Sequence, residues 1–174
     1  MMKEYSVLLG RFCPFHLGHQ KIVDKLIYDF GEKSVLIIIG SSTTINSRTP
    51  YTFSQRKNMI RSIYPNIRIL PLPDPEPNLI TFHNDTNNVW LDSVEELEKR
   101  MKAKFTFFGG SVEDLKVLAE RFKTKVLIDR KEKSNKISAT KIRRALSKKD
   151  LKTATKMLDS KVLPLALDTR FVVN

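Results

Sequence analysis

Short apolar runs alternate with helical patterns along most of the chain. Continuous apolar runs at 5–10 and 34–39 have the length and composition of buried strands. Between them, apolar residues recur at helical spacing over 22–30. The chain is therefore predicted to begin with a strand, a helix and a second strand. The same alternation continues, with predicted strands at 67–72, 104–108 and 125–129 and predicted helices at 53–64, 90–102 and 111–122.

This alternation defines the expected fold class. Strands that are apolar on both faces and separated by helices pair in parallel, and helices then cover both faces of the sheet. We expect an α/β fold, a single Rossmann-like, doubly wound domain over residues 1–174 with about five parallel strands. Helical patterns at 138–149 and 150–158 and an apolar segment at 163–167 predict a small helical C-terminal appendage. Ligands of such sheets bind where the strands end.

Residues 71–88 interrupt the alternation. Prolines stand at every second position from 71 to 77, and proline neither continues a central strand nor fits inside a helix. The polar residues that follow show no period, so a long loop is expected. Loops of this length in compact domains are mostly functional or mobile. Asp74 and His83 lie in this loop without an assigned role.

The chain is strongly basic, with 31 Lys and Arg, 19 Asp and Glu and a net charge of +12. Such a field attracts polyanions of any kind, nucleotides and nucleic acids included. Lysines taken singly are mostly solvated surface residues. The basic residues gather late in the chain, at 131–136, 143–144 and 148–149.

The sequence also suggests a cellular compartment. Its longest apolar run, 35–39, is far shorter than the roughly 18 to 20 residues of a membrane span. The first residues lack the pattern of a secretory signal. The single cysteine, Cys13, cannot form an internal disulfide or a multi-cysteine metal site. We therefore expect a cytoplasmic protein with no membrane partner.

Residues 10–19, GRFCPFHLGH, form the first candidate site. If the strand ends near Gly10, this segment lies at its carboxyl end and begins the next helix, whose unpaired N–H groups and dipole attract phosphate. His16 and His19, three residues apart, can donate hydrogen bonds to phosphate oxygens, and Arg11 adds a planar fork of donors. An isolated pair of histidines at a helix start would more often be a surface cap. Its spacing does not match the zinc-protease pattern.

Residues 137–146, ISATKIRRAL, form the second candidate site. Ser138 has the position of an N-cap, and Thr140 and Arg143 lie three residues apart in the first turns of the expected helix. Hydroxyl groups and a guanidinium thus meet again at a helix N-terminus. Alone, this segment would be an ordinary capped basic helix, but its pairing with residues 10–19 favours one polyphosphate held by both.

The first segment resembles a known signature. G-R-F-x-P-F-H-x-G-H over 10–19 is similar to the HxGH motif of the nucleotidylyltransferase superfamily, in the form found in archaeal-type nicotinamide mononucleotide adenylyltransferases. The resemblance implies that His16, His19 and Arg11 are catalytic and hold the triphosphate of ATP, with both histidines beside the α-phosphate. It also implies that the same segment supplies the ATP-binding residues Gly10, Phe12 and Gly18.

Two later segments are also similar to this family. Residues 137–146 resemble its I-S-x-T-x-I-R motif, which implies that Ser138, Thr140 and Arg143 bind the β- and γ-phosphates. Gly109 and Gly110 follow the fourth strand, where the family lays adenosine against the backbone. A tight turn without a ligand is the alternative for this pair.

Arg130 and Cys13 complete the ATP side. Arg130 follows the fifth predicted strand on the same rim and is a candidate phosphate ligand. Cys13 stands where glutamine is common in the family. As a lone thiol between two apolar neighbours it is expected to be a packing residue, not a nucleophile.

Residues 47–56 follow the second strand and are similar to the family segment R-x-P-F-T-x-x-E-R. The resemblance implies that Arg48 reaches the phosphate of the mononucleotide. Tyr51 and Gln55 stand where the family has phenylalanine and glutamate. For Arg56, a solvated arginine on the helix and a functional arginine are about equally expected.

Asn87 and Trp90 match the family pattern N-x-x-W. The resemblance implies that Asn87 binds the carboxamide or ribose and that Trp90 stacks on the nicotinamide ring, as cationic rings favour. Without that match, a single tryptophan at a helix start would be a core anchor. These two residues are the best indication of the acceptor.

Together the resemblances imply transfer of AMP from ATP to nicotinamide mononucleotide, with Mg²⁺ assisting through the phosphates. The acceptor phosphate attacks the α-phosphorus in line, and NAD and pyrophosphate form. Related acceptors stay open: nicotinate mononucleotide, phosphopantetheine, or the alcohol phosphate of a cytidylyltransferase.

Two hypotheses of other classes remain. A nucleic-acid-binding module would need basic residues clustered around exposed aromatic platforms, whereas the aromatics here mostly fall in apolar strands or at the nucleotide rim, so no nucleic acid partner is expected. A regulatory relative could bind nucleotide without reacting. The sequence leaves the oligomeric state open, with a homo-oligomer as one option.

Overall fold

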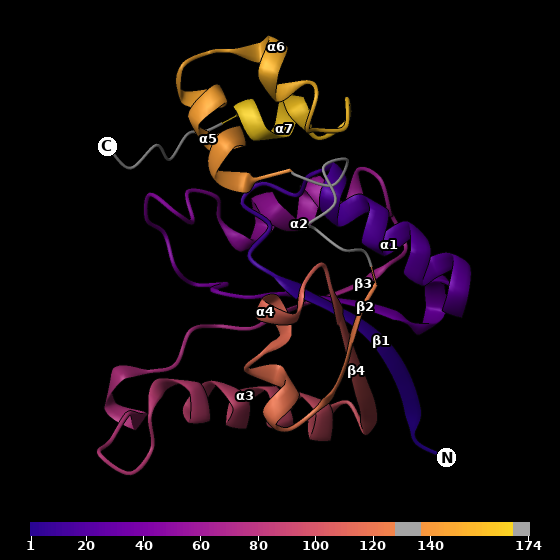
Figure 1. Cartoon of the computed structure of the whole chain (residues 1–174), viewed down its shortest axis with the longest axis vertical. Coiled ribbons are helices and arrows are strands. Elements are labelled where there is room, and N and C mark those ends of the chain that lie inside the picture. Colours follow the sequence, from indigo (N-terminus) through magenta and orange to yellow (C-terminus); the bar gives the residue numbers. More distant parts are fainter. Residues whose placement is uncertain (128–136, 169–174) are drawn as a thin grey trace.

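The structure is a computed structural model that describes residues 1–127 and 137–168. A parallel sheet of five strands runs through its centre in the order β3-β2-β1-β4-β5 (Figure 1). The predicted α/β class and parallel pairing are confirmed. The chain order reverses between β1 and β4, the place where doubly wound sheets bind ligands. The strands are β1 (Lys3–Gly10), β2 (Val35–Ile39), β3 (Arg68–Pro71), β4 (Ala103–Gly109) and β5 (Lys123–Val126).

Helices cover both faces of this sheet, with α1 and α2 on one face and α3 and α4 on the other (Figure 1). Short 3₁₀ turns, labelled η, complete several connections. The helical elements are α1 (Leu17–Phe30), η1 (Glu32–Ser34), α2 (Phe53–Arg61), η2 (Pro77–Leu79), α3 (Thr86–Arg100), α4 (Val112–Leu115), η3 (Leu118–Glu120), α5 (Ala139–Ser147), α6 (Leu151–Ala154) and α7 (Leu163–Leu167).

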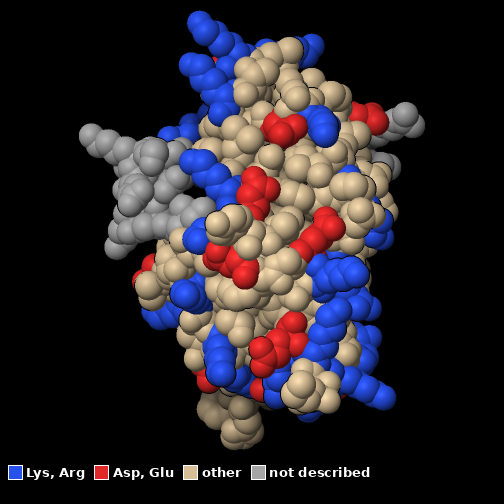
Figure 2. Space-filling view, turned by 90° about the vertical axis from the view of Figure 1, so that its right-hand side faces the viewer, with Lys and Arg blue, Asp and Glu red and all other residues tan. Residues whose placement is uncertain are grey.

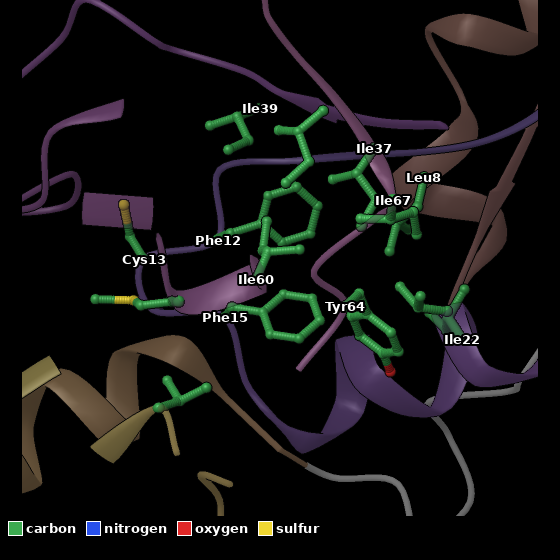
Figure 3. Close-up of a cluster of buried hydrophobic side chains, with 14 of the residues drawn as sticks. Leu8, Phe12, Cys13, Phe15, Ile22, Ile37, Ile39, Ile60, Tyr64 and Ile67 are labelled. Carbon is green, nitrogen blue, oxygen red and sulfur yellow. The ribbon is translucent and has the colours of Figure 1, made fainter. Parts of the chain in front are cut away.

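Strand β2 explains why two helical layers form. All five of its residues are buried. Successive side chains of a strand point to opposite faces, so Ile37 and Ile39 join the cluster under α1 and α2, whereas Leu36 and Ile38 join the cluster under α3 and α4. Figure 3 shows the first cluster, where Phe12 packs beside the isoleucines. The aromatic residues of the 10–19 segment therefore anchor it to the core.

Several helices differ from their predicted bounds, and α3 and α4 differ in ways that the structure describes in detail. The expected helix over 111–122 is wrong: α4 ends at Leu115, and η3 follows. Beyond α4 the backbone makes hydrogen bonds at the three-residue spacing of a 3₁₀ turn, such as that from the Glu120 N–H to Val117 O, and Leu115 and Leu118 are both buried. Helix α3 begins four residues earlier than predicted, because the Asp85 side chain accepts a hydrogen bond from the Asn88 N–H and caps it there.

The long loop predicted after the third strand is present between Pro71 and Thr86. It contains η2 and a tight turn in which Thr81 and Asn84 exchange backbone hydrogen bonds. Phe82 at its tip is 98% exposed. The loop joins the end of β3 to α3, so both of its ends lie at the carboxyl edge of the sheet or beside it.

The C-terminal helices α5, α6 and α7 lie together beyond α2 (Figure 1). Several hydrogen bonds tie this appendage to segments at the carboxyl edge. The Leu17 N–H donates to Met157 O at 3.0 Å, and the Tyr51 hydroxyl donates to Ala166 O at 2.8 Å. Arg143 Nη1 donates to Cys13 O at 2.8 Å. The appendage therefore holds the two segments in which the first motif and Arg48 lie.

Tyr51→Phe is expected to lower the free energy of unfolding by about 1 to 2 kcal/mol, because the variant leaves the buried carbonyl of Ala166 without its donor. Urea denaturation followed by circular dichroism measures this difference. Tyr28→Phe is the control, because Tyr28 is 89% exposed. Equal denaturation midpoints for the two variants would show that the hydroxyl does not stabilise the appendage.

Among the residues described, none of the helices combines the length and the apolar character needed to cross a bilayer.

Candidate active site

Two adjoining cavities open at the carboxyl edge of the sheet. The larger has a volume of about 580 Å³ and the smaller about 290 Å³. Arg11 and His19 line both cavities, so the two spaces meet at the first motif. A ligand with a polar chain and two bulky ends could extend through both.

The two histidines form one rigid unit at the start of α1. His16 is the N-cap and is 3% exposed, and its Nδ1 accepts hydrogen bonds from the N–H groups of Gly18 at 3.1 Å and His19 at 3.4 Å. In return, His19 Nδ1 accepts from the His16 N–H at 3.2 Å. The two rings stack, with centroids 3.6 Å apart. This reciprocal capping box fixes both imidazoles.

The same hydrogen bonds decide which ring nitrogen can act on a ligand. A nitrogen that accepts a backbone N–H carries no proton, so a neutral imidazole in this arrangement has its proton on Nε2. His16 and His19 both line the smaller cavity. In the neutral form of each ring, Nε2 is therefore the nitrogen that carries the proton.

Gly18 is required by this arrangement. A Cβ atom at residue 18 would lie 3.0 Å from Cε1 and 3.1 Å from Nδ1 of His16. The imidazole that caps the helix would have to shift by a few tenths of an ångström to make room for a side chain there. The glycine of the HxGH motif thus protects the position of the first histidine.

Positive side chains gather around the smaller cavity. Arg11, Arg48 and Arg143 line it, and none of the described residues that line it is acidic. Burial lowers the pKa of Arg143, and the positive charges of Arg48 and Arg11 act in the same direction. Like charges held this close indicate a site for a polyanion, which would relieve their repulsion. Arg11 belongs to the segment 10–19 and Arg143 to the segment 137–146, and both line the smaller cavity.

Hydroxyl groups complete the smaller cavity. Ser138 caps α5 through a hydrogen bond from the Lys141 N–H, and Thr140 Oγ1 accepts from Arg143 Nη2 at 3.4 Å. Both residues line the cavity. The N-terminus of α5 therefore faces the same space as the histidine turn, which gives this cavity two helix starts.

The larger cavity has a different character. Backbone at Gly10, Gly40 and Gly109, at the ends of three neighbouring strands, forms its floor, and Gly110 also lines it. Trp90 on α3 contributes an aromatic wall. Its polar lining includes Asn87, Ser41, Asp74 and Asp114.

Asp74 is held in place by two hydroxyl groups from the loop after β2. Its carboxylate accepts hydrogen bonds from Ser41 Oγ at 2.8 Å and from Thr44 Oγ1 at 2.5 Å. Sequence reasoning left Asp74 without a role and did not consider Ser41 or Asp114. The position of Ser41 directly beyond the second strand was a usable signal, whereas the approach of the proline-rich loop to that strand was not visible in the sequence.

The predicted site residues therefore divide between the cavities. Arg48 lies with the residues predicted to bind the triphosphate and not in the cavity of Asn87 and Trp90. Its assignment to the mononucleotide stays a prediction, which requires the acceptor phosphate to enter the smaller cavity. Phe12 lines that cavity but is 1% exposed and packs on His19, and Arg130 lies outside the described residues.

Cys13 is buried beside these groups. Burial raises the pKa of its thiol, and a protonated thiol is a poor nucleophile. The packing role expected for Cys13 agrees with its place in the core cluster (Figure 3).

The surface of the molecule carries charge well beyond the site. Figure 2 shows Lys and Arg around the margins of one face, with acidic residues scattered between them. The net charge of +12 gives the protein a general positive field, and the smaller cavity differs from it because Arg11, Arg48 and Arg143 line one space together.

Comparison with known proteins agrees with the motifs. Residues 7–145 match the cytidylyltransferase-like family. A nicotinamide-nucleotide adenylyltransferase of Thermoplasma volcanium is 32% identical over 114 residues, which cover 60% of this chain and 56% of the relative. The chain thus spans about half the length of the curated relatives that it matches.

Solved structures share the fold. A structure of NadR protein in complex with NAD and AMP-PNP has a TM-score of 0.60 and 24% identity, covering 84% of this chain and 43% of the other. A bifunctional NMN adenylyltransferase/ADP ribose pyrophosphatase of Francisella tularensis, complexed with AMP and a manganese ion, has a TM-score of 0.57 and 21% identity, covering 95% of this chain and 52% of the other. The family match spans both motifs and most of the sheet, and the resemblance seen in residues 10–19 and 137–146 is confirmed: this chain belongs to the cytidylyltransferase-like family.

Proposed function

We propose that this chain transfers the AMP group of ATP to nicotinamide mononucleotide and forms NAD and pyrophosphate. The observation that carries the proposal is the pair of cavities that meet at Arg11 and His19. One is cationic and suits a polyphosphate, and the other combines a glycine floor with an aromatic wall and suits nucleosides. The sequence relatives bear the name of this activity.

The substrates follow from the lining of each cavity. The β- and γ-phosphates of ATP occupy the smaller cavity at Ser138, Thr140 and Arg143. The α-phosphate lies at the junction, beside His19 and Arg11. The larger cavity, within the usual range of about 300 to 1,000 Å³ for small-molecule sites, receives the nucleoside parts.

Within the larger cavity, the two nucleosides separate by chemistry. Adenosine lies against the backbone of Gly109 and Gly110, where a flat base can approach closely. The acceptor lies at Asn87 and Trp90, because a cationic nicotinamide ring gains from an aromatic face.

The reaction needs positioning and charge stabilisation more than a covalent intermediate. A phosphate oxygen of the acceptor attacks the α-phosphorus and forms a new P–O bond. The bond from that phosphorus to the bridging oxygen breaks, and pyrophosphate leaves with the electron pair. The Nε2 donors of the histidines stabilise the α-phosphate oxygens, and Arg143 stabilises the charge that grows on pyrophosphate.

ATP enters this site as its Mg²⁺ complex. In residues 1–127 and 137–168, no group of three or more His, Cys, Asp or Glu side chains could hold a metal ion. Mg²⁺ keeps several waters and binds through substrate phosphates, so the hydroxyl-lined cavity accommodates such a complex. When bound with ATP, Mg²⁺ would supply neutralisation of phosphate charge in addition to that from Arg11, Arg48 and Arg143. A cytoplasmic location, where both nucleotides occur, is part of the proposal.

One assay across acceptors tests the proposal. Purified protein with ATP and Mg²⁺ is incubated with nicotinamide mononucleotide, nicotinate mononucleotide or phosphopantetheine, and separately with CTP in place of ATP. Chromatography of dinucleotide products and a pyrophosphate assay give the rates. NAD is expected as the fastest-forming product. Consumption of another acceptor with nicotinamide mononucleotide untouched would overturn the substrate assignment.

Trp90→Leu is expected to raise KM for nicotinamide mononucleotide by about tenfold, because the leucine fills space but removes the aromatic face worth about 1 to 2 kcal/mol to a cation. KM for ATP should change less than about twofold. Steady-state kinetics with each substrate varied in turn measure both values. Phe82→Leu is the control, because this exposed aromatic lies outside both cavities. Equal effects of Trp90→Leu on both substrates would contradict stacking on the acceptor.

A further inference from the structure

Arg56 on α2 is the largest fully buried side chain of the described structure, with 0% exposure. Its guanidinium donates to four backbone carbonyls. Nη1 lies 3.0 Å from Arg11 O and 2.8 Å from Gly40 O, and Nη2 lies 2.9 Å from Ser41 O. Nε lies 3.3 Å from Thr52 O within its own helix. The guanidinium donors are therefore bonded to main-chain carbonyls, so Arg56 has no role in contacting a ligand.

Three of these carbonyls belong to the ends of two neighbouring strands. Arg11 directly follows β1, and Gly40 and Ser41 directly follow β2. The Gly40 N–H also donates to Gly10 O at 2.9 Å, so the backbones stay adjacent after the strands end. Arg56 therefore bridges the two chain segments at the point where both turn into the larger cavity.

Each bridged segment carries a group that faces this cavity. Arg11 lines both cavities, and Ser41 holds the carboxylate of Asp74. Ser41 has a φ of +47°, a conformation uncommon for a residue other than glycine. A bond to its carbonyl from a rigid, buried donor helps to keep this backbone in place.

The chemistry of the side chain suits this task. Among the described residues, no carboxylate lies at ion-pair distance from Arg56, and burial lowers its pKa, although the negative charge of Asp74 favours the charged form. Backbone carbonyls therefore solvate the charge. Only a planar fork of five donors reaches both strand ends at once, which an ammonium group cannot do.

We propose that Arg56 is a positioning residue that fixes the distance between the ends of β1 and β2, so that Arg11 is aligned for the reaction and the Ser41–Asp74 pair keeps its place in the lining of the larger cavity. This inference rests on the proposed function. Displacements of about 1 Å at a reacting centre can cost up to 10²-fold in rate. Arg56 thus acts on turnover through Arg11 without touching a substrate.

The test compares Arg56→Met and Arg56→Lys with Met59→Ala, a change of another fully buried side chain on the same helix that lines neither cavity. All are assayed at a temperature at which circular dichroism shows them folded. Arg56→Met should lower kcat by about tenfold, and Arg56→Lys by about threefold or more. KM for nicotinamide mononucleotide should change less than threefold, because Asn87 and Trp90 lie on α3. Met59→Ala should keep kcat within twofold of the unchanged protein.

Equal kcat for the folded forms of Arg56→Met and Met59→Ala would overturn the inference. If Arg56→Met does not fold, Arg56→Lys decides, and a kcat equal to that of the unchanged protein overturns it. If the unchanged protein has no turnover, the proposed function fails separately. Titration with the non-hydrolysable analogue AMP-CPP and Mg²⁺ then tests Arg56 alone: tenfold weaker binding in the methionine variant supports the inference, and unchanged binding overturns it.

Discussion

His19→Asn is expected to lower kcat by about 10²-fold or more, while the protein stays folded. His19 lines both cavities, at the junction where the α-phosphate is proposed to react. Removing one donor to a developing anion typically costs 10² to 10³ in kcat. The asparagine oxygen can replace Nδ1 as acceptor for the His16 N–H, so the capping box survives. What the variant lacks is a donor at the position of Nε2.

A second substitution separates the two nitrogens of the ring. His19→Gln can place an amide N–H near the position of Nε2, so it should retain more turnover than asparagine and less than histidine. Urea denaturation measures whether the variant keeps the stabilising helix cap. The value of kcat at saturating MgATP and acceptor measures the effect of losing the donor at the position of Nε2. His83→Ala is the control, because this exposed histidine lines neither cavity. If asparagine and glutamine variants both turn over at the original rate, His19 has no catalytic role.

The architecture could be predicted because its signals are local. Strand β2 is apolar at every position, and buried parallel strands have this pattern. The end of the strand–helix alternation at prolines 71–77 and the helix cap at Ser138 each depend on a few adjacent residues, so they could be predicted as well. Prediction failed for the helix expected over 111–122, which ends at Leu115 and is followed by a 3₁₀ turn, because the spacing of Leu115 and Leu118 fits an α-helix and a 3₁₀ turn alike.

The site was predictable to the same extent. The histidine turn and the α5 N-terminus were identified, because each motif combines a cap with phosphate-binding side chains in one stretch. The role of Arg56 could not be predicted from the sequence. The burial of its side chain depends on contacts with residues that lie 15 and 45 positions away along the chain, directly after β2 and β1. The grouping of Arg48 with Arg143 and the anchoring of Asp74 by Ser41 depend in the same way on distant segments.

Arg143→Met is expected to lower kcat/KM for ATP by about 10²-fold, because Arg143 lines the smaller cavity together with Arg11 and Arg48, where the triphosphate is proposed to bind. KM for the acceptor should change little, since Trp90 lies in the other cavity. Inhibition by pyrophosphate should weaken in parallel, because pyrophosphate is proposed to leave through the contacts of Arg143. Initial rates with ATP varied, with and without added pyrophosphate, measure these effects.

Arg144→Met distinguishes a placed charge from the general positive field. Arg144 is the next residue on α5, is exposed and lines neither cavity, so this variant changes the net charge by the same amount. Screening by salt makes distant surface charges weak, and kcat/KM for ATP should stay within about twofold at physiological ionic strength. Comparable losses in the two variants would mean that bulk charge attracts ATP and that the convergence of arginines on the smaller cavity is not what binds its phosphates.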